Sequence, residues 1–341
     1  MKTSYLLKSL FLILCAVFFE SCSDDKEAVV VFYCGAEGDG TNLTGSISNG
    51  VLTISGKGDM RDYTSTESPF QTYAEAIKSV VIDNNVTSIG DWAFHSCSNL
   101  TGITIPNGIT SIGYSAFATC SSLTNITIPS SVTSIGNAAF AHCSSLTNIT
   151  ISDGVTSIGD FTFTDCSSLA SITIPEGVSS IGYSAFENCR NLTNITIPDG
   201  VTYIGHHAFQ WCSDLTGITL PNSITSIREH AFFHCSSLIS IAIPNGVSCI
   251  DWGTFSCCYS LTNVIIPSSV TEIVRYAFNN CGSLDTIEVY WEVPIIIDPS
   301  VYESSSIATA TLIVPAGSKE AYEAAGVWNS FGTIVEREIN K

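Results

Sequence analysis

Apolar residues return along most of this chain with a fixed period of 23 positions. The unit reads A-F-x-x-C-x-x-L-x-x-I-x-I-P-x-x-V-x-x-I-G, and residues 121–143, SSLTNITIPSSVTSIGNAAFAHC, span one full period. The phenylalanine, cysteine and leucine recur nine times with no insertion or deletion. A unit of this length cannot bury a core of its own, so the copies must stack on one another.

Each unit carries the signals of two short strands and a turn. In LTNITI (residues 123–128) apolar and polar residues alternate, which predicts a strand. PSS (129–131) has residues that favour a turn, and VTSI (132–135) is a second extended segment. GNAAFAHC (136–143) predicts a tight turn with one turn of α- or 3₁₀-helix. The predicted fold is an α/β repeat solenoid, right-handed and with a parallel β-sheet. It has about nine 23-residue coils, and neighbouring coils lie about 4.8 Å apart.

The repeat divides the chain into a solenoid and its flanks. We predict an N-terminal cap at residues 28–82, the solenoid at 83–289 and a C-terminal cap at 290–341. Solenoids need caps because their end coils are otherwise open to water. In the C-terminal cap, Ser318 is placed to begin a short helix that ends at Gly326.

The first 27 residues resemble an export signal. A basic start and an apolar run from Leu10 to Phe19 precede Cys22, which is followed at once by acidic residues. This resembles a bacterial lipoprotein signal (residues 1–21) with Cys22 as the lipidated residue and 22–27 as the anchor or linker. The run 23–27 is similar to the surface-export signal of Bacteroidetes lipoproteins. The resemblance implies an exported protein held at the outer membrane or cell surface by a lipid; the alternative is plain secretion.

The repeat itself resembles the BspA-like, or Treponema pallidum type, leucine-rich repeat family. The similarity covers residues 86–289, where the Ala-Phe, Cys, Leu and Ile-Pro of the unit all fall in register. The resemblance implies a bacterial surface protein that binds host proteins or other cells.

The acidic composition of the chain argues against nucleic acid and anionic lipid as partners. The chain carries 31 acidic and 12 basic residues, a net charge of −19, and only 13% of its residues are charged. Nucleic acid and anionic lipid headgroups need basic patches, and the sequence has none. No phosphate loop, metalloprotease helix or catalytic triad order appears. We therefore predict a protein that is not an enzyme and that uses no cofactor.

The repeat cysteines raise the question of disulfides, because exported proteins often contain them. Stacked side chains run parallel, however, whereas a disulfide needs converging Cβ atoms. We predict a buried structural ladder in which each thiol bonds a turn carbonyl. Cys34, Cys249 and Cys257 lie outside this column, and disulfides there stay open. The ladder residues are Cys97, Cys120, Cys143, Cys166, Cys189, Cys212, Cys235, Cys258 and Cys281.

Two clusters are candidate metal sites. His207 and His230 share one column in adjacent coils, about 5 Å apart at the strand spacing. Asp153, Glu176 and Asp199 stack in one turn column, where a Ca²⁺ ion would relieve their repulsion. The competing interpretations are a solvated histidine pair and ordinary turn residues, so the sequence assigns no metal.

Aromatic residues at variable turn positions are the candidates for ligand binding. Aromatic side chains in polar surroundings are common in recognition sites. The sequence favours an adhesion or protein-recognition module that binds a host matrix or cell-surface protein, with residues 203–278 as the binding region. The alternatives are a glycan-capture module of a nutrient-uptake system and a passive spacer. Phe161 shares these turn positions, and the candidates are Trp92, Tyr114, Tyr183, Tyr203, Trp211, Phe233, Trp252, Tyr259 and Tyr276.

Overall fold

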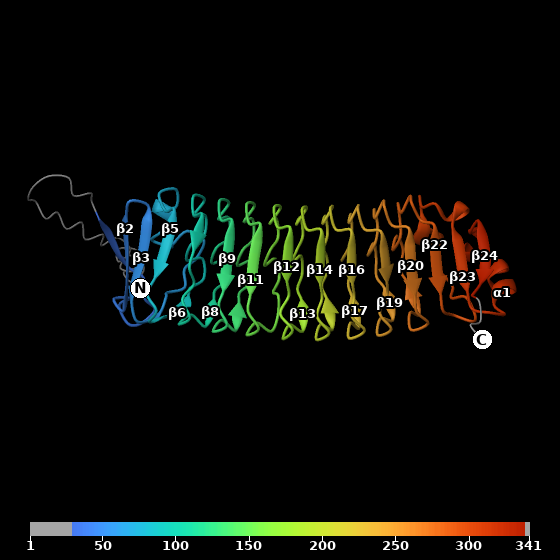
Figure 1. Cartoon of the computed structure of the whole chain (residues 1–341), viewed down its shortest axis with the longest axis horizontal. Helices are drawn as coiled ribbons and strands as arrows, with labels where there is room; N and C mark the ends of the chain where they lie inside the picture. The colour runs from blue at the N-terminus through green and yellow to red at the C-terminus, as the bar shows by residue number, and fades with distance from the viewer. Residues whose placement is uncertain (1–28, 338–341) are drawn as a thin grey trace, which may run out of the picture.

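The computed structural model describes residues 29–337 as an elongated rod of stacked coils (Figure 1). The chain advances by one coil about every 23 residues, and the rod has about 11 turns. The described N-terminal and C-terminal ends lie at opposite ends of the rod. The predicted parallel-stranded solenoid is confirmed, and residues assigned to the caps supply the turns beyond nine. No helix in residues 29–337 is long and apolar enough to cross a membrane.

The first strand of each coil builds one face of the rod. Paired residues are 23 apart, as in Ile126 beside Ile149, so each isoleucine column enters the core in register. Strand pairing is interrupted after β16, where two sheets meet, but the Ile239 N–H still donates to the Thr216 carbonyl across that boundary, at 3.2 Å. The parallel strands of this face, in order, are β3 (Val51–Gly56), β5 (Ser79–Ile82), β7 (Gly102–Ile103), β9 (Asn125–Ile128), β11 (Asn148–Ile151), β12 (Ser171–Thr173), β14 (Asn194–Thr196), β16 (Gly217–Thr219), β18 (Ser240–Ala242), β20 (Asn263–Ile266), β22 (Thr286–Val289), β23 (Thr311–Val314) and β24 (Thr333–Glu336).

The VTSI segments form a second series of short parallel strands. Every strand of the series from β6 onward contributes one buried isoleucine, such as Ile135 or Ile204, whereas the first strand, β4, has none. Threonine hydroxyls beside these strands donate to the carbonyl one coil back, as Thr110 does to Thr87 at 3.1 Å. The strands are β4 (Gly58–Asp59), β6 (Val86–Ile89), β8 (Ser111–Ile112), β10 (Ser134–Ile135), β13 (Ser180–Ile181), β15 (Tyr203–Ile204), β17 (Ser226–Ile227), β19 (Cys249–Ile250) and β21 (Glu272–Ile273).

The third edge of each coil consists of successive turns. The sequence predicts a tight turn and one turn of helix here, and the structure forms turns alone. Backbone donors explain the difference. The N–H groups of Trp92, Phe94 and Ser96 donate to carbonyls of the next coil at 2.8 Å, while the intervening N–H groups bond within their own turns. A helix would use all of these donors within one coil and leave the stack without them.

Phenylalanine rings form a continuous stack through the core. The repeat phenylalanines are fully buried, and neighbouring ring centroids lie 5.2–5.7 Å apart with nearly parallel planes. Phe70 extends the stack at the N-terminal end (5.7 Å from Phe94) and Tyr302 extends it at the C-terminal end (5.5 Å from Phe278). The stack therefore passes from one cap to the other.

Beside this stack lies the column of repeat cysteines, all of them buried. From Cys120 onward, each thiol donates a hydrogen bond to the carbonyl of the phenylalanine 26 residues earlier, at 3.2–3.3 Å. Burial raises the pKa of every thiol in the column, to about 12 for Cys97 and Cys143. All twelve cysteines in the described part of the chain are free.

The N-terminal end is closed by an antiparallel meander. β1 (Val30–Tyr33) pairs with β2 (Leu43–Ser48), and β2 pairs with β3 before the parallel stack begins. The 3₁₀-helix η1 (Gln71–Tyr73) follows Phe70. This arrangement covers the first parallel coil with chain of a different geometry.

The C-terminal end is covered by a short helix and aromatic side chains. Helix α1 (Lys319–Glu323) is shorter than predicted, and the Ser318 side chain makes no capping bond. Glu336 caps the helix instead, because its Oε1 accepts from the N–H groups of Gly317 (2.9 Å) and Lys319 (3.1 Å). Buried Tyr322 and Trp328 pack edge to face beneath it. The 3₁₀-helices here are η2 (Pro299–Tyr302), η3 (Ile307–Thr309) and η4 (Val327–Ser330).

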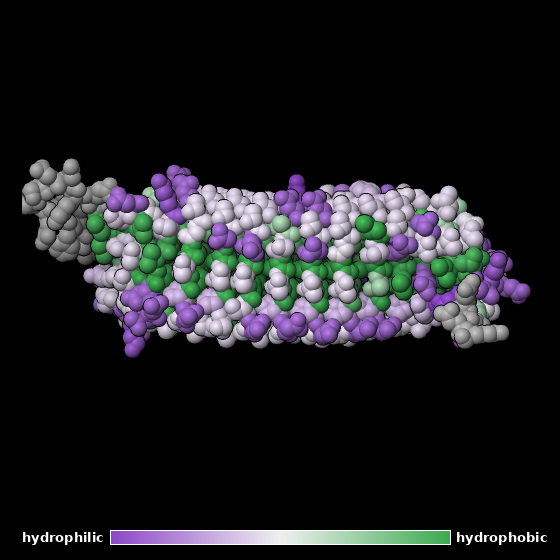
Figure 2. All heavy atoms as spheres, viewed as in Figure 1, coloured by the Kyte–Doolittle hydropathy of each residue, from purple (hydrophilic) through white to green (hydrophobic). Residues whose placement is uncertain are grey.

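The surface is polar but sparsely charged. On the face seen in Figure 2, most residues are close to neutral in hydropathy, and strongly hydrophilic residues are scattered among them. A hydrophobic band shows between two pale bands along the length of the rod. Residues that break this regularity are therefore the candidates for a binding site.

Candidate recognition surface

Two columns of the turn edge hold the backbone in the left-handed region. One is the fifth residue before the repeat cysteine, and the other is the residue just before it. All eighteen residues have φ between 49° and 63°, and only Gly253 among them is a glycine. Side chains with a Cβ disfavour this region, so each residue here other than Gly253 stores strain that the stacked coils must hold. The backbone under these side chains is thus fixed whatever residue occupies the position.

Six rings form a continuous line along this edge, which we call the aromatic ridge. It runs through coils whose turns lie between residues 159 and 278. Successive ring centroids are 5.0, 5.3, 5.1, 4.3 and 6.2 Å apart. The ridge consists of Phe161, Tyr183, His207, His230, Trp252 and Tyr276.

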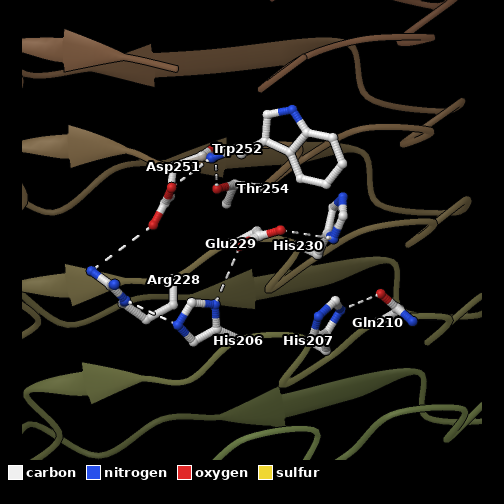
Figure 3. A network of polar contacts seen from close by, with 9 residues as sticks. All are labelled: His206, His207, Gln210, Arg228, Glu229, His230, Asp251, Trp252 and Thr254. Atoms are coloured by element: carbon white, nitrogen blue, oxygen red, sulfur yellow. Dashed lines mark hydrogen bonds and ion pairs between the residues drawn. The ribbon is translucent and has the colours of Figure 1, made fainter. Parts of the chain in front are cut away.

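Polar contacts hold the histidines of the ridge and its neighbours in place (Figure 3). His207 Nδ1 lies 2.6 Å from Gln210 Oε1. His206 Nδ1 lies 3.7 Å from a Glu229 carboxylate oxygen, while its Nε2 accepts from Arg228 at 3.5 Å. The pKa of His230 is lowered, mainly by burial and to a smaller extent by the nearby His207. The His230 ring is therefore neutral at pH 7.

A second group of rings, the Trp211 platform, adjoins the ridge. The indole of Trp211 stacks on His234 with centroids 3.8 Å apart and planes 18° apart. The Tyr259 hydroxyl lies 3.4 Å from His234 Nε2. Phe233 joins the two groups, since its ring lies 5.9 Å from Trp211 and 4.9 Å from His230.

The structure brings most of the candidate aromatics together. Tyr183, Trp211, Phe233, Trp252, Tyr259 and Tyr276 all belong to the connected rings. Trp92 and Tyr114 contact each other at 5.3 Å, nearer the N-terminal end. Tyr203 is exposed on β15, and within residues 29–337 its ring pairs with no other aromatic ring. The sequence analysis treated His207 and His230 as candidate metal ligands or a solvated pair. The columns that the histidines share with Trp92, Phe161 and Trp211 were a signal that they extend the aromatic surface.

The candidate metal ligands do not form a metal cluster. The rings of His207 and His230 stack at a tilt of 42°, and Gln210 occupies Nδ1 of the first. Asp153, Glu176 and Asp199 are exposed turn residues. In the described residues, no three His, Cys, Asp or Glu side chains converge as metal ligands would.

Three of the described cysteines, Cys34, Cys249 and Cys257, lie outside the ladder. Burial raises the pKa of Cys34 to about 12. Partial burial, with Glu272 and Asp251 nearby, raises the pKa of Cys249 to about 11. Cys257 is nearly buried and takes one of the left-handed turn positions. A thiol must ionise to act as a nucleophile, and burial opposes that ionisation at Cys34 and Cys249.

Comparisons with known proteins agree with the repeat architecture. The family model described as "BspA type Leucine rich repeat region" matches residues 67–193 and 179–309, with six copies. A leucine-rich repeat protein from Eubacterium ventriosum is 24% identical with a TM-score of 0.50, and the alignment covers 82% of this chain and 96% of that one. A leucine-rich repeat protein from Bacteroides ovatus is 22% identical with a TM-score of 0.49 (87% and 98% covered). A leucine-rich cell surface protein from Faecalibacterium prausnitzii is 23% identical with a TM-score of 0.43 (88% and 94%). No curated protein matches the chain.

Proposed function

The chain belongs to the BspA-type leucine-rich repeat family, and on that premise we propose that it is an exported surface protein that recognises another protein through the aromatic ridge. The partner is a host matrix or cell-surface protein, and the role is adhesion without catalysis. The observation that carries this proposal is the continuous line of rings, four of them exposed by 36–41%, on a backbone that the stacking of coils holds fixed.

Physical chemistry favours such a surface for protein binding. Tryptophan and tyrosine supply large contact areas for little loss of conformational freedom, and they dominate binding hot spots. The ridge is also pre-organised, because four of its six residues lie on left-handed backbone and every ring contacts its neighbours along the line. Binding therefore costs less ordering entropy than binding through a flexible loop.

The charge of the chain narrows the partner. With a net charge of −19, the protein repels acidic surfaces at long range. Glu229 lies beside the ridge, and Arg228 beside it is within 3.9 Å of the Asp251 carboxylate. A partner with a neutral or basic face suits this edge, and nucleic acid does not.

Anchoring at the N-terminal end would suit this role. Cys22, the predicted lipidation site, lies outside the described residues. The ridge begins about six coils from the N-terminal end of the rod, about 30 Å at the strand spacing. A lipid at Cys22 would thus present the ridge away from the membrane surface.

Substitution of ridge residues tests the proposal. Surface plasmon resonance would measure binding of the full-length protein to immobilised extracellular-matrix proteins. Trp252→Asn copies Asn137, which stands at the same place in another coil, so it removes the ring and keeps a residue that the turn accepts. We expect the unsubstituted protein to bind at least one matrix protein. Trp252→Asn should raise the Kd of that complex about 30-fold, which corresponds to the loss of a hot spot worth about 2 kcal/mol.

The matched control is Trp92→Ser, which removes an aromatic ring away from the ridge and copies Ser115 and Ser184. It should leave Kd unchanged. Binding to none of the matrix proteins, or equal losses in both variants, would count against the ridge as the site of recognition.

A further inference from the structure

A polar hollow lies on the turn edge, N-terminal to the Trp211 platform. It has a volume of about 440 Å³ and is lined by His142, Ser144, Asp165, Ser167 and Arg190. The first and third of these stand just before a repeat cysteine, and the others stand just after one. The hollow thus follows the groove between two columns over three successive coils. Its size falls within the range of ligand sites on proteins.

The lining offers donors and acceptors side by side. His142 Nδ1 lies 3.2 Å from Asp165 Oδ2, which orients the imidazole and leaves Nε2 for other contacts. The Ser167 hydroxyl donates to the Ser144 carbonyl at 3.4 Å, so its lone pairs are left to accept. Arg190 forms no ion pair with any residue in the described range, and its five N–H groups are directed by no carboxylate.

Beyond the lining residues, the column of His142 and Asp165 continues through Asn188 to the aromatic ring of Trp211. Trp211 and His234 occupy the same column in adjacent coils, and their rings stack along the rod. This stacking covers one face of the indole and turns the other toward the coil of Arg190. The indole is 36% exposed, and its backbone is fixed at φ 62°. A ligand lying in the hollow would meet this face as it extends toward the C-terminal end.

We propose that the hollow and the free face of Trp211 form a binding site for a neutral saccharide chain. Vicinal hydroxyl groups supply donors and acceptors in pairs, which matches a carboxylate and a guanidinium placed in neighbouring coils. Asp165 and His142 bind hydroxyls on one sugar, Arg190 binds the next, and Trp211 packs against the apolar face of a ring. The four coils span about 15 Å at the strand spacing, the length of a short oligosaccharide.

Charge selects a neutral ligand over an acidic one. Within the hollow the charges of Asp165 and Arg190 cancel, and the whole protein carries −19. A chain of uronic acids would bring several negative charges to one guanidinium against that field. An acidic peptide meets the same repulsion, and it offers fewer hydroxyl pairs to the two serines.

Affinity electrophoresis of the full-length protein tests this site. Native gels would contain dextran, laminarin, galactomannan or arabinoxylan, with polygalacturonate as the acidic comparison. We expect slower migration in at least one neutral gel and none in polygalacturonate. Arg190→Gln and Trp211→Asn should each raise Kd about tenfold or more; the second copies Asn188 and Asn280, which occupy the same left-handed column.

The control is Trp252→Asn on the ridge, which should leave saccharide binding unchanged and thereby separates this site from the proposed protein-binding surface. Circular dichroism melts would show that each variant is folded. Unchanged migration in all four neutral gels overturns the proposal. So does retardation by polygalacturonate alone, binding of a polyglutamate peptide that Arg190→Gln removes, or retardation that both Arg190→Gln and Trp211→Asn leave intact.

Discussion

Alkaline pH should unfold this protein through its buried thiols. Burial raises the pKa of all nine ladder cysteines, whereas a thiol in the unfolded chain ionises near pH 8.5. Between these values the unfolded state releases protons that the folded state keeps. Stability is therefore intact below about pH 8.5 and falls as pH rises toward the folded-state pKa.

The magnitude follows from linkage. A pH of 9.5 is about one unit above the thiol pKa in the unfolded chain. At this pH, each thiol that stays protonated in the folded state lowers the free energy of unfolding by about 1.4 kcal/mol. Nine such thiols amount to about 13 kcal/mol, which is as large as the whole stability of many domains. We therefore expect the urea midpoint to fall steeply between pH 7.5 and 9.5, measured by tryptophan fluorescence and far-ultraviolet circular dichroism in the presence of reductant.

A single-thiol variant provides the matched comparison. Cys166→Ala removes one ionisable group and its 3.2 Å bond to the Phe140 carbonyl. The variant should be less stable than the parent at pH 7.5, yet its loss of stability up to pH 9.5 should be about 1.4 kcal/mol smaller. A urea midpoint that is equal at pH 7.5 and 9.5, or the same pH dependence in both proteins, would refute the reasoning.

Three further predictions follow from the stack, the turns and the N-terminus. Phe163→Ala should lower the unfolding free energy by about 3–5 kcal/mol in urea, because it leaves a cavity between rings 5.7 and 5.4 Å away; a loss below about 1 kcal/mol would mean that the stack closes up. Thr119→Asn should raise it by about 1 kcal/mol, since asparagine tolerates the φ of 63° better than a β-branched residue, while Thr119→Ala should gain less. Mass spectrometry of the mature protein should find acyl chains on Cys22, and an unmodified N-terminus would disprove the lipid anchor.

The repeat made the strands and the core predictable. Residues of one column, such as Ile126 and Ile149, pair in register only if the coils stack. The 23-residue period and the alternation of apolar and polar residues together therefore predicted the parallel sheet. The Phe117-type column predicted a core element in the same way. Both flanks, which lack the repeat, still carry one aromatic each into the ring stack, Phe70 and Tyr302, and no periodic signal marked those two residues.

The turn edge was less predictable because its backbone is decided by hydrogen bonds between coils. Left-handed positions are recognised in sequences by glycine, and here Thr119, Phe161 and Trp211 occupy them. Shared columns indicated that aromatics would lie near one another along the rod. Contacts across columns, such as Phe233 between Trp211 and His230, depend on side-chain direction, which a single sequence does not specify.

The hydrogen bonds between coils run along the rod, and this orientation decides how the protein responds to tension. A pull between the N-terminal end and a ligand on the ridge loads the intervening coils in series. It acts on their bonds one coil at a time, so the rod should yield by unzipping at low force. Each released coil of 23 residues adds about 80 Å of extended chain. In the adhesion role proposed above, such a tether would lengthen under load and would spare the contact that it holds.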